Sequence, residues 1–301
     1  KENAEIWEKG FTIDEINKKI DKLASNGLLY DFYVKKKGLF GYERRERYVA
    51  FPDYILGWYE FYWMRIQQTG ELPPKEIANL LEVYQTQTGY YDELYKGDVP
   101  YFRTFVREDA LPEDELVQIM DYESVSDIIE KADTLCISGC GCRLHMKSCG
   151  HDIGEYPTNS CFSFNKTAEN LLRNGMAKTI SRPEAREIVE HCKSLGMCET
   201  GDNLKMPNFL CHCEKQFCSV FGAMNRFGKK SFVPSNYIAV VANVTNCVSC
   251  GQCVKNCPVN AIKLTKMITE EEKEEEEFED LGEKVSDEVR EAQKKRRKKK
   301  Q

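Results

Sequence analysis

Long apolar runs are missing from this chain, and so are the features of an export signal. No stretch approaches the roughly 20 apolar residues needed to cross a bilayer. The first ten residues, KENAEIWEKG, lack the basic-then-apolar order of a signal peptide. We therefore expect a cytoplasmic protein without a membrane span.

The motifs of several common enzyme classes are also missing. The sequence shows no Ser-His-Asp order, no GxGxxG turn, no Walker loop and no carboxylate constellation. Histidine is scarce, with four residues, and only His212, which lies between two cysteines, is placed to ligate a metal. A histidine in such a position more often tunes a neighbouring cluster by hydrogen bonding. We see no independent site for making or breaking bonds in an organic substrate.

Cysteine, in contrast, is abundant, with 14 residues in a chain of formal charge −6. Disulfides belong mostly to small secreted domains, and nothing here indicates export. Metal binding is therefore the better interpretation of these thiols. The acidic bulk of the chain favours low reduction potentials and basic redox partners.

One motif near the C-terminus carries the most information. Cys247, Cys250, Cys253 and Cys257, followed by Pro258, have the spacing C-x2-C-x2-C-x3-C-P. Bacterial-type ferredoxins use this spacing to bind a 4Fe-4S cluster, with the fourth cysteine normally ligating a second cluster. Structural zinc uses two cysteine pairs, or one pair and histidine. The motif therefore predicts an iron-sulfur cluster rather than zinc.

The partner run that completes such a domain is missing. Eight-iron ferredoxins contain two of these runs, and each lends its fourth cysteine to the other cluster. After Cys257 the chain has no further cysteine. Either Cys257 closes its own cluster, or the middle of the chain supplies the missing ligand.

Two upstream segments, CISGCGCRLHMKSCG and LCHCEKQFC, are rich in cysteine. Each contains a C-x-C pair with another cysteine a few residues away, which fits a metal-binding loop. The alternative is that these are small buried hydrophobic residues, our interpretation of Cys192. The candidate ligands are Cys140, Cys142, Cys149 and Cys161 in the first set, and Cys211, Cys213 and Cys218, which Cys257 could complete, in the second.

The seven upstream candidates and the four cysteines of the C-terminal motif make eleven thiols, and this number limits how many clusters the chain can bind. Three 4Fe-4S clusters would take about twelve thiolates, one more than the candidates supply. We expect two clusters, with one or three as alternatives. Arg143, directly after Cys142, is placed to tune a cluster through its charge.

Residues 1–70 read as a winged-helix-like module. Thr12 and Glu15 form a capping box before an apolar helical stripe that Gly27 closes. Strands are expected over 28–34 and 48–51, joined by a basic turn. Basic wing residues can bind DNA phosphates, but residues 1–60 hold 11 basic and 11 acidic side chains, which disfavours nucleic-acid binding.

The rest of the chain completes an α+β organisation. We expect a helical domain with cysteine loops over 71–232, including a helix that starts at Ser181 and runs to about 195. A small ferredoxin-like segment follows over 233–266. Residues 267–301 form a charged tail, which we expect to be disordered or an exposed helix.

The cysteine pattern resembles that of ferredoxin-type 4Fe-4S binding proteins of anaerobic bacteria and archaea. In that group a C-x-C-R segment, a helical stretch and a C-x-C-rich segment precede a C-terminal ferredoxin domain. The residues that carry the resemblance are Cys140, Cys142, Arg143, Cys149 and Cys161, then Cys211, Cys213 and Cys218, then the run from Cys247 to Pro258. This chain departs from the group by keeping one ferredoxin run.

These observations predict an electron-transfer protein more than a stand-alone enzyme. It would be a carrier or a subunit of an anaerobic oxidoreductase complex, with a flavoprotein, hydrogenase or reductase as partner. One alternative is an iron-sulfur redox-sensing transcription regulator that binds DNA through the winged-helix-like module. Another is a catalytic cluster with an open iron site.

Overall fold

The chain combines helices and strands, as the predicted α+β class requires. A computed structural model describes residues 10–37, 43–52, 57–71, 74–111, 120–234 and 244–264. The predicted tail over 267–301 lies outside the described residues. Among the described residues, no helix has the length and apolar character that crossing a membrane would need.

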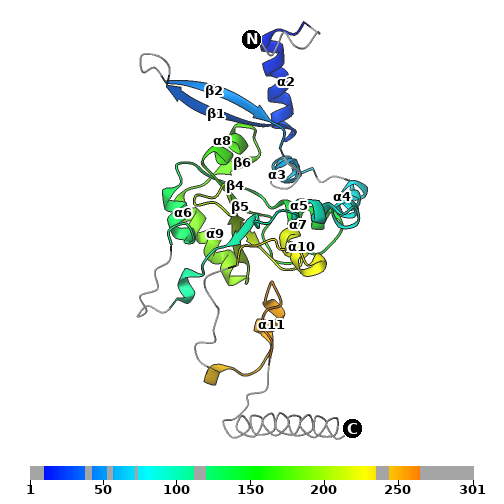
Figure 1. Ribbon diagram of the computed structural model, residues 1–301, viewed down its shortest axis with the longest axis vertical. Coiled ribbons are helices and arrows are strands. Elements are labelled where there is room, and N and C mark those ends of the chain that lie inside the picture. The colour runs from blue at the N-terminus through cyan, green and yellow to red at the C-terminus, as the bar shows by residue number, and fades with distance from the viewer. Residues whose placement is uncertain are drawn as a thin grey trace, which may run out of the picture.

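A six-stranded antiparallel sheet forms the centre of the molecule (Figure 1). Its spatial order is β3-β7-β8-β5-β4-β6. The strands are β3 (Phe102–Thr104), β4 (Leu135–Gly139), β5 (Asn159–Phe164), β6 (Ala177–Thr179), β7 (Cys198–Asp202) and β8 (Phe209–Cys213). The sequence predicted a helical middle with cysteine loops, and the structure adds this sheet to it. Five of the six strands are only three or five residues long, which explains why no alternating pattern revealed them.

Helices surround the sheet. They are α3 (Tyr59–Thr69), α4 (Lys75–Gln87), α5 (Tyr90–Leu94), α6 (Val125–Lys131), α7 (Gly141–Ser148), α8 (Asn165–Arg173), α9 (Arg182–Ser194) and α10 (Ser219–Phe227), with a 3-10 turn η3 (Glu108–Ala110). The predicted start of α9 is confirmed, because Ser181 and Glu184 form a reciprocal capping box there.

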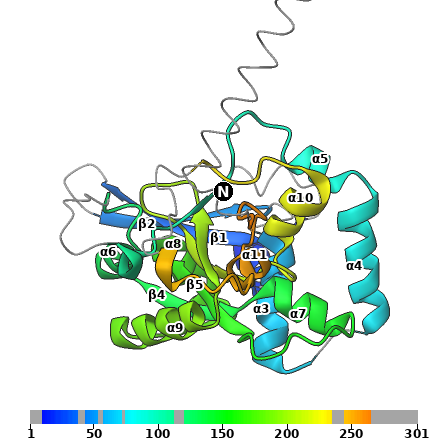
Figure 2. The same cartoon turned by 90° about the horizontal axis from the view of Figure 1, so that it is seen from below.

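The two faces of the sheet have different roles because side chains alternate along each strand. Ile137, Phe162 and Leu210 point to one face and pack in a single core against α6 and α9 (Figures 1 and 2). The neighbouring residues Cys161 and Cys211 therefore point to the opposite face. We call this second face the cysteine face.

The N-terminal module begins with α2 (Ile13–Ser25), where the predicted capping box is confirmed. Thr12 Oγ1 accepts from the Glu15 backbone N–H, and Glu15 accepts from the Thr12 backbone N–H at 2.8 Å. Gly27 follows with φ of 75°. A Cβ atom there would lie 2.8 Å from Phe61 Cβ, so glycine lets the chain pass close to α3.

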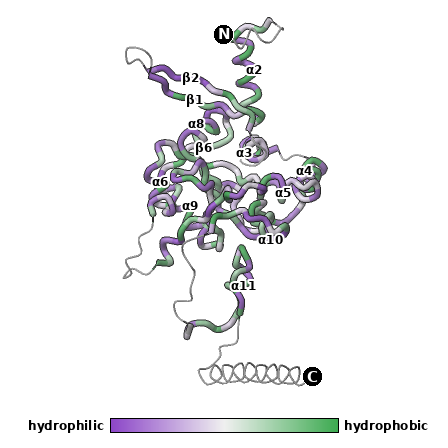
Figure 3. Tube along the Cα trace, in the orientation of Figure 1, coloured by the Kyte–Doolittle hydropathy of each residue, from purple (hydrophilic) through white to green (hydrophobic). Residues whose placement is uncertain are grey.

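The hairpin that follows pairs β1 (Tyr30–Lys37) with β2 (Glu43–Ala50) over eight residues each. The strands are longer than predicted because the basic residues belong to the ladder rather than to a turn. The far end of the hairpin is hydrophilic (Figure 3). Lys36 and Arg44 both form ion pairs with Glu46, which offsets part of the basic charge. The order helix, strand, strand agrees with a winged helix, and that identity stays a prediction.

A buried carboxylate joins this hairpin to the central domain. Asp31 is fully buried and pairs with Arg47 at 2.9 Å and with Arg173 at 2.9 Å. Asn170 and Asn174 also donate to it, at 2.8 and 3.0 Å. Three of these four partners lie on α8 or directly after it, so Asp31 attaches the module to α8.

A second buried polar group connects α3, α4 and α7. Tyr59 donates a hydrogen bond to His145 Nδ1 at 2.7 Å, and His145 Nε2 donates to the Ala78 carbonyl at 2.7 Å. The imidazole also stacks on Trp63, with ring centroids 5.2 Å apart. Tyr59, Trp63 and nearby Phe61 are all buried, so these aromatic residues form part of the core.

The C-terminal described segment contains a 3-10 turn η4 (Val244–Asn246) and a short helix α11 (Gln252–Asn256). It lies against the end of the central domain near α10 (Figures 1 and 2). Asn225 Nδ2 donates to the Pro258 carbonyl at 2.7 Å, and Lys215 donates to the Asn260 side chain. These contacts place the C-terminal cysteine motif beside the chain that follows β8.

Candidate metal centre

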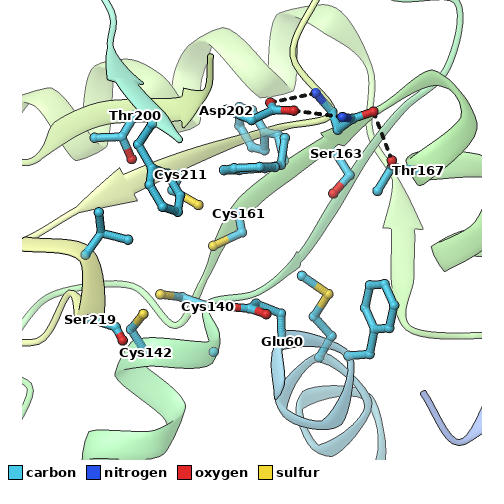
Figure 4. A pocket seen from close by; sticks show the side chains of 18 of the residues that line it. Glu60, Cys140, Cys142, Cys161, Ser163, Thr167, Thr200, Asp202, Cys211 and Ser219 are labelled. Carbon is cyan, nitrogen blue, oxygen red and sulfur yellow. Dashed lines mark hydrogen bonds between the residues drawn. The ribbon is translucent and has the colours of Figure 1, made fainter. Parts of the chain in front are cut away.

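Six cysteine thiols meet on the cysteine face and form a closed ring, which we call the thiol ring. Its members are Cys140, Cys142, Cys161, Cys211, Cys213 and Cys218. Each thiol interacts with the next around the ring, in the order Cys140, Cys142, Cys218, Cys213, Cys211, Cys161 and back to Cys140. In Figure 4 the four labelled cysteines point into one shared space. The two upstream cysteine segments therefore build a single site.

Sheet register and helix starts position these thiols. Cys211 and Cys213 are two residues apart on β8, so both point to the cysteine face. Cys161 lies on β5, the strand beside β8. Cys140 and Cys218 are the N-cap residues of α7 and α10, where helix dipoles favour thiolates. The predicted loop placement is thus replaced by strands and helix N-termini.

The turn between Cys213 and Cys218 is held by Glu214. Its carboxylate accepts the backbone N–H groups of Gln216 at 2.7 Å and Phe217 at 3.1 Å. Its carbonyl also accepts the Cys218 N–H at 3.1 Å. The turn brings Cys218 Sγ to 3.3 Å from Cys213 Sγ. Glu214 thereby fixes one side of the thiol ring.

A buried arginine provides positive charge beside the ring. Arg143 is 2% exposed and donates to the carbonyls of Pro157 and His212, each at 2.8 Å, and to the Ser160 hydroxyl. Among the described residues no carboxylate forms an ion pair with it. Burial would lower the pKa of Arg143, but Cys140 and other ring thiols raise it, so the side chain stays charged. A buried cation of this kind calls for an anionic partner.

The thiols themselves differ in proton affinity. Hydrogen bonds from Cys142 and Cys161 hold the pKa of Cys140 well below its usual value, with help from Arg143. Hydrogen bonds from Cys211 and Cys218 lower the pKa of Cys213 to about 7. Thiolate character, as at Cys140, is what iron and other soft metals require.

The arrangement of the six thiols favours a cluster over a single metal ion. Among the residues that the structure describes, no three cysteine, histidine, aspartate or glutamate side chains converge on one metal position. A tetrahedral zinc ion needs such convergence, whereas each thiolate of a 4Fe-4S cluster binds a different iron atom. Six thiols around a common space fit the second requirement.

A cavity of about 410 Å³ opens at the ring, and all six ring cysteines line it. This volume lies in the range of small-molecule sites, about 300–1,000 Å³. One wall is polar: Asp202 accepts from the Asn208 backbone at 2.9 Å and side chain at 2.7 Å, and Thr167 donates to Asn208 (Figure 4). Burial raises the pKa of Asp202. Glu60 lies on the opposite wall.

The C-terminal motif shows a different arrangement. Cys247, Cys250 and Cys253 are exposed, whereas Cys257 is 8% exposed. The Ala261 N–H donates to Cys257 Sγ at 3.2 Å. Burial would raise the pKa of Cys257, but this and neighbouring backbone N–H groups outweigh it, so the pKa is lowered. Such N–H donors stabilise a thiolate.

Some predicted residues lie elsewhere. Cys149 does not line the cavity; it packs beside Leu144 in the aromatic core at the other end of α7. His212 is fully buried and donates from Nδ1 to the Ser160 carbonyl at 2.6 Å, with burial lowering its pKa to about 4. Cys192 is fully buried on α9, as expected.

Sequence reasoning missed Thr200. Its hydroxyl lies 3.1 Å from Cys213 Sγ, because β7 and β8 are paired in register. Register between distant segments leaves no local signal in the sequence.

Comparison with known proteins identifies one domain. Residues 240–263 match the family described as a 4Fe-4S binding domain. The match contains all four cysteines of the C-terminal motif. Searches of curated proteins and of solved structures gave no match. The domain makes this an iron-sulfur protein capable of electron transfer.

Proposed function

We propose that this chain carries two 4Fe-4S clusters and passes electrons as a carrier or subunit of an anaerobic oxidoreductase complex. One cluster would be held by Cys247, Cys250, Cys253 and Cys257, and the other by the thiol ring. A 4Fe-4S cluster supplies reversible one-electron transfer at a potential set by nearby charge, hydrogen bonds and burial.

The thiol ring is the main support for the proposed second cluster. It offers at least the four thiolates that a cubane needs, from segments up to 78 residues apart in sequence. Arg143 supports the same assignment, because a cluster with four thiolate ligands is anionic and would partner its buried charge. The residues present therefore fit the group.

The ring also bears on the fourth C-terminal ligand. Six ring thiols exceed the need of one cubane, so Cys257 is not required there. Its lowered pKa suits a ligand. We therefore assign Cys257 to the cluster of Cys247, Cys250 and Cys253, which is the first of the two arrangements that the sequence left open. Cys149 is left out of both sites.

The state of the cysteines suits a protein of a reducing compartment. The 14 cysteines are all free thiols, as in proteins of reducing compartments such as the cytoplasm. The formal charge of −6 favours a basic surface on the partner, for example a flavoprotein, hydrogenase or reductase.

Iron and acid-labile sulfide counts test this proposal. Anaerobically purified or reconstituted protein should hold about eight iron and eight sulfide per chain and give cubane EPR signals under dithionite. Cys140→Ser should remove about four iron, whereas the matched variant Cys149→Ser should keep all eight. A wild-type count of about four, unchanged in Cys140→Ser, would leave the ring without a cluster and refute the proposal.

The cavity supports one alternative function. Because it reaches all six ring thiols, a small substrate could approach a cluster there directly, as in a catalytic cluster with an open iron site. Cyanide, a small iron ligand, should then shift the EPR signal of the ring cluster. An unchanged signal at saturating cyanide would exclude an open iron.

A further inference from the structure

The thiol ring contains more sulfur than one cubane uses. Six thiols line the cavity, and a 4Fe-4S cluster takes four. Two ring thiols are therefore left over once the cluster proposed above is bound. Which two they are follows from the geometry of the ring.

Cys213 and Cys218 form one close pair in the ring. Their sulfur atoms lie 3.3 Å apart, and Cys218 donates to Cys213. Small side-chain rotations would bring them to a disulfide length of about 2.05 Å. The pair is five residues apart along the chain, and the Glu214 turn holds it without any metal.

The other four thiols form an uninterrupted arc. In ring order they are Cys142, Cys140, Cys161 and Cys211. They come from α7, the end of β4, β5 and β8, and in Figure 4 they point into one shared space. Arg143 lies next to the start of this arc, where the charge of a cluster would develop.

Cys213 also has a partner that a ligand would not need. The Thr200 hydroxyl lies 3.1 Å from its sulfur, on the strand that carries Cys198. Lys215, two residues after Cys213, donates to the side chain of Asn260, three residues after Cys257 of the C-terminal motif. The Cys213–Cys218 side of the ring is thus the side that faces the other predicted cluster.

We propose that Cys213 and Cys218 form a redox-active dithiol beside a ring cluster ligated by Cys140, Cys142, Cys161 and Cys211. The inference rests on the ring cluster of the proposed function. Oxidation removes one electron and one proton from each thiol and forms one S–S bond; reduction restores both. The electrons are exchanged with a low-potential one-electron carrier, or with a small disulfide or dithiol that enters the cavity.

The test uses the iron-loaded full chain. Samples are equilibrated anaerobically with reduced and oxidised dithiothreitol in varied ratios, trapped with N-ethylmaleimide in acid and digested with trypsin. A Cys213–Cys218 bond links peptide 206–215 to peptide 216–226. We expect this linked peptide to appear as the ratio becomes oxidising, while iron per chain stays unchanged.

Serine variants separate ligand from dithiol. Cys213→Ser and Cys218→Ser should keep the wild-type iron count and ring EPR signal but lose the linked peptide. Cys211→Ser should lose about four iron, and Cys192→Ala, a buried thiol outside the ring, should change neither readout.

Each contrary result has a distinct meaning. Loss of about four iron in Cys213→Ser or Cys218→Ser would make that residue a ligand and overturn the inference. Unchanged iron with no linked peptide at any ratio would also overturn it. Wild-type protein with iron only at the C-terminal motif would instead refute the ring cluster of the proposed function.

Discussion

Arg143 Nη1 donates a hydrogen bond across 2.8 Å to the backbone carbonyl of His212, the residue between Cys211 and Cys213. This bond ties α7, which lies within the first cysteine segment, to β8, which holds the C-x-C pair of the second. It joins residues 69 positions apart in sequence. The side chain that follows the first C-x-C pair therefore orients the second pair.

Arg143→Gln should destabilise the protein and weaken iron retention at the thiol ring. The shorter neutral side chain leaves buried carbonyl groups unpaired, at a cost of about 1–3 kcal/mol each. We expect the free energy of unfolding to fall by about 3 kcal/mol in urea titrations. Arg107→Gln is the matched control, since half-exposed Arg107 also donates to two carbonyls. Equal losses in the two variants would contradict the special role of Arg143.

Asp31→Asn should loosen the N-terminal hairpin from the central domain. The change removes a buried charge and leaves Arg47 and Arg173 without their shared partner. Breaking a buried ion pair costs about 3–5 kcal/mol, and the partial exposure of both arginines reduces this to about 2 kcal/mol. Limited proteolysis should cut the variant near the hairpin first. Glu46→Gln, which affects ion pairs at the surface, should cost much less stability than Asp31→Asn.

Acid should destabilise the protein partly through Asp31. Burial would raise the pKa of Asp31, but hydrogen bonds from Arg173 and Asn174 and the nearby arginine charges lower it overall. A lowered folded-state pKa gives stability that is present above the unfolded value of about 3.9 and is lost as pH falls through the folded value. The relevant window is about pH 5 to pH 2. In this window the free energy of unfolding should depend less steeply on pH in Asp31→Asn than in the wild type.

His145 should add a second pH dependence at higher pH. Burial lowers its pKa in the folded protein, and neutral Nδ1 accepts the Tyr59 hydroxyl. The unfolded chain takes up the proton near pH 6.5, so stability decreases as pH falls below about 6.5. Tyr59→Phe removes the donor and should cost about 1 kcal/mol at pH 7.5. In His145→Gln the free energy of unfolding should change less between about pH 6.5 and pH 5 than in the wild type. An unchanged dependence would contradict a buried neutral imidazole.

Cys257→Ser should affect the C-terminal cluster alone. Iron should fall by about four per chain, and the EPR signal of the ring cluster should remain. Lys215→Gln, a neighbouring surface change, should leave iron unchanged. Loss of the ring signal in Cys257→Ser would instead support sharing of Cys257 with the ring, the second arrangement that the sequence allowed.

Local features of the structure were predictable because their physical causes lie within a few residues. The capping boxes at Thr12 and Ser181 depend on side chains three positions apart, and both helices start where expected. Pairing of β1 with β2 was also predictable, since the strands are neighbours in sequence. The short strands of the central sheet were not, because three to six residues show too little alternation.

The sequence by itself determined the iron-sulfur character of this protein. In the C-terminal motif the four cysteines lie within eleven residues, so their spacing alone matches a family of 4Fe-4S binding domains. Only the tertiary structure decided which upstream thiols belong together. Cys161 and Cys211 are 50 positions apart and meet because β5 pairs with β8, while Cys149, only seven residues after Cys142, turns into the aromatic core. Strand register and helix direction set these distances, and neither can be read from spacing along the chain.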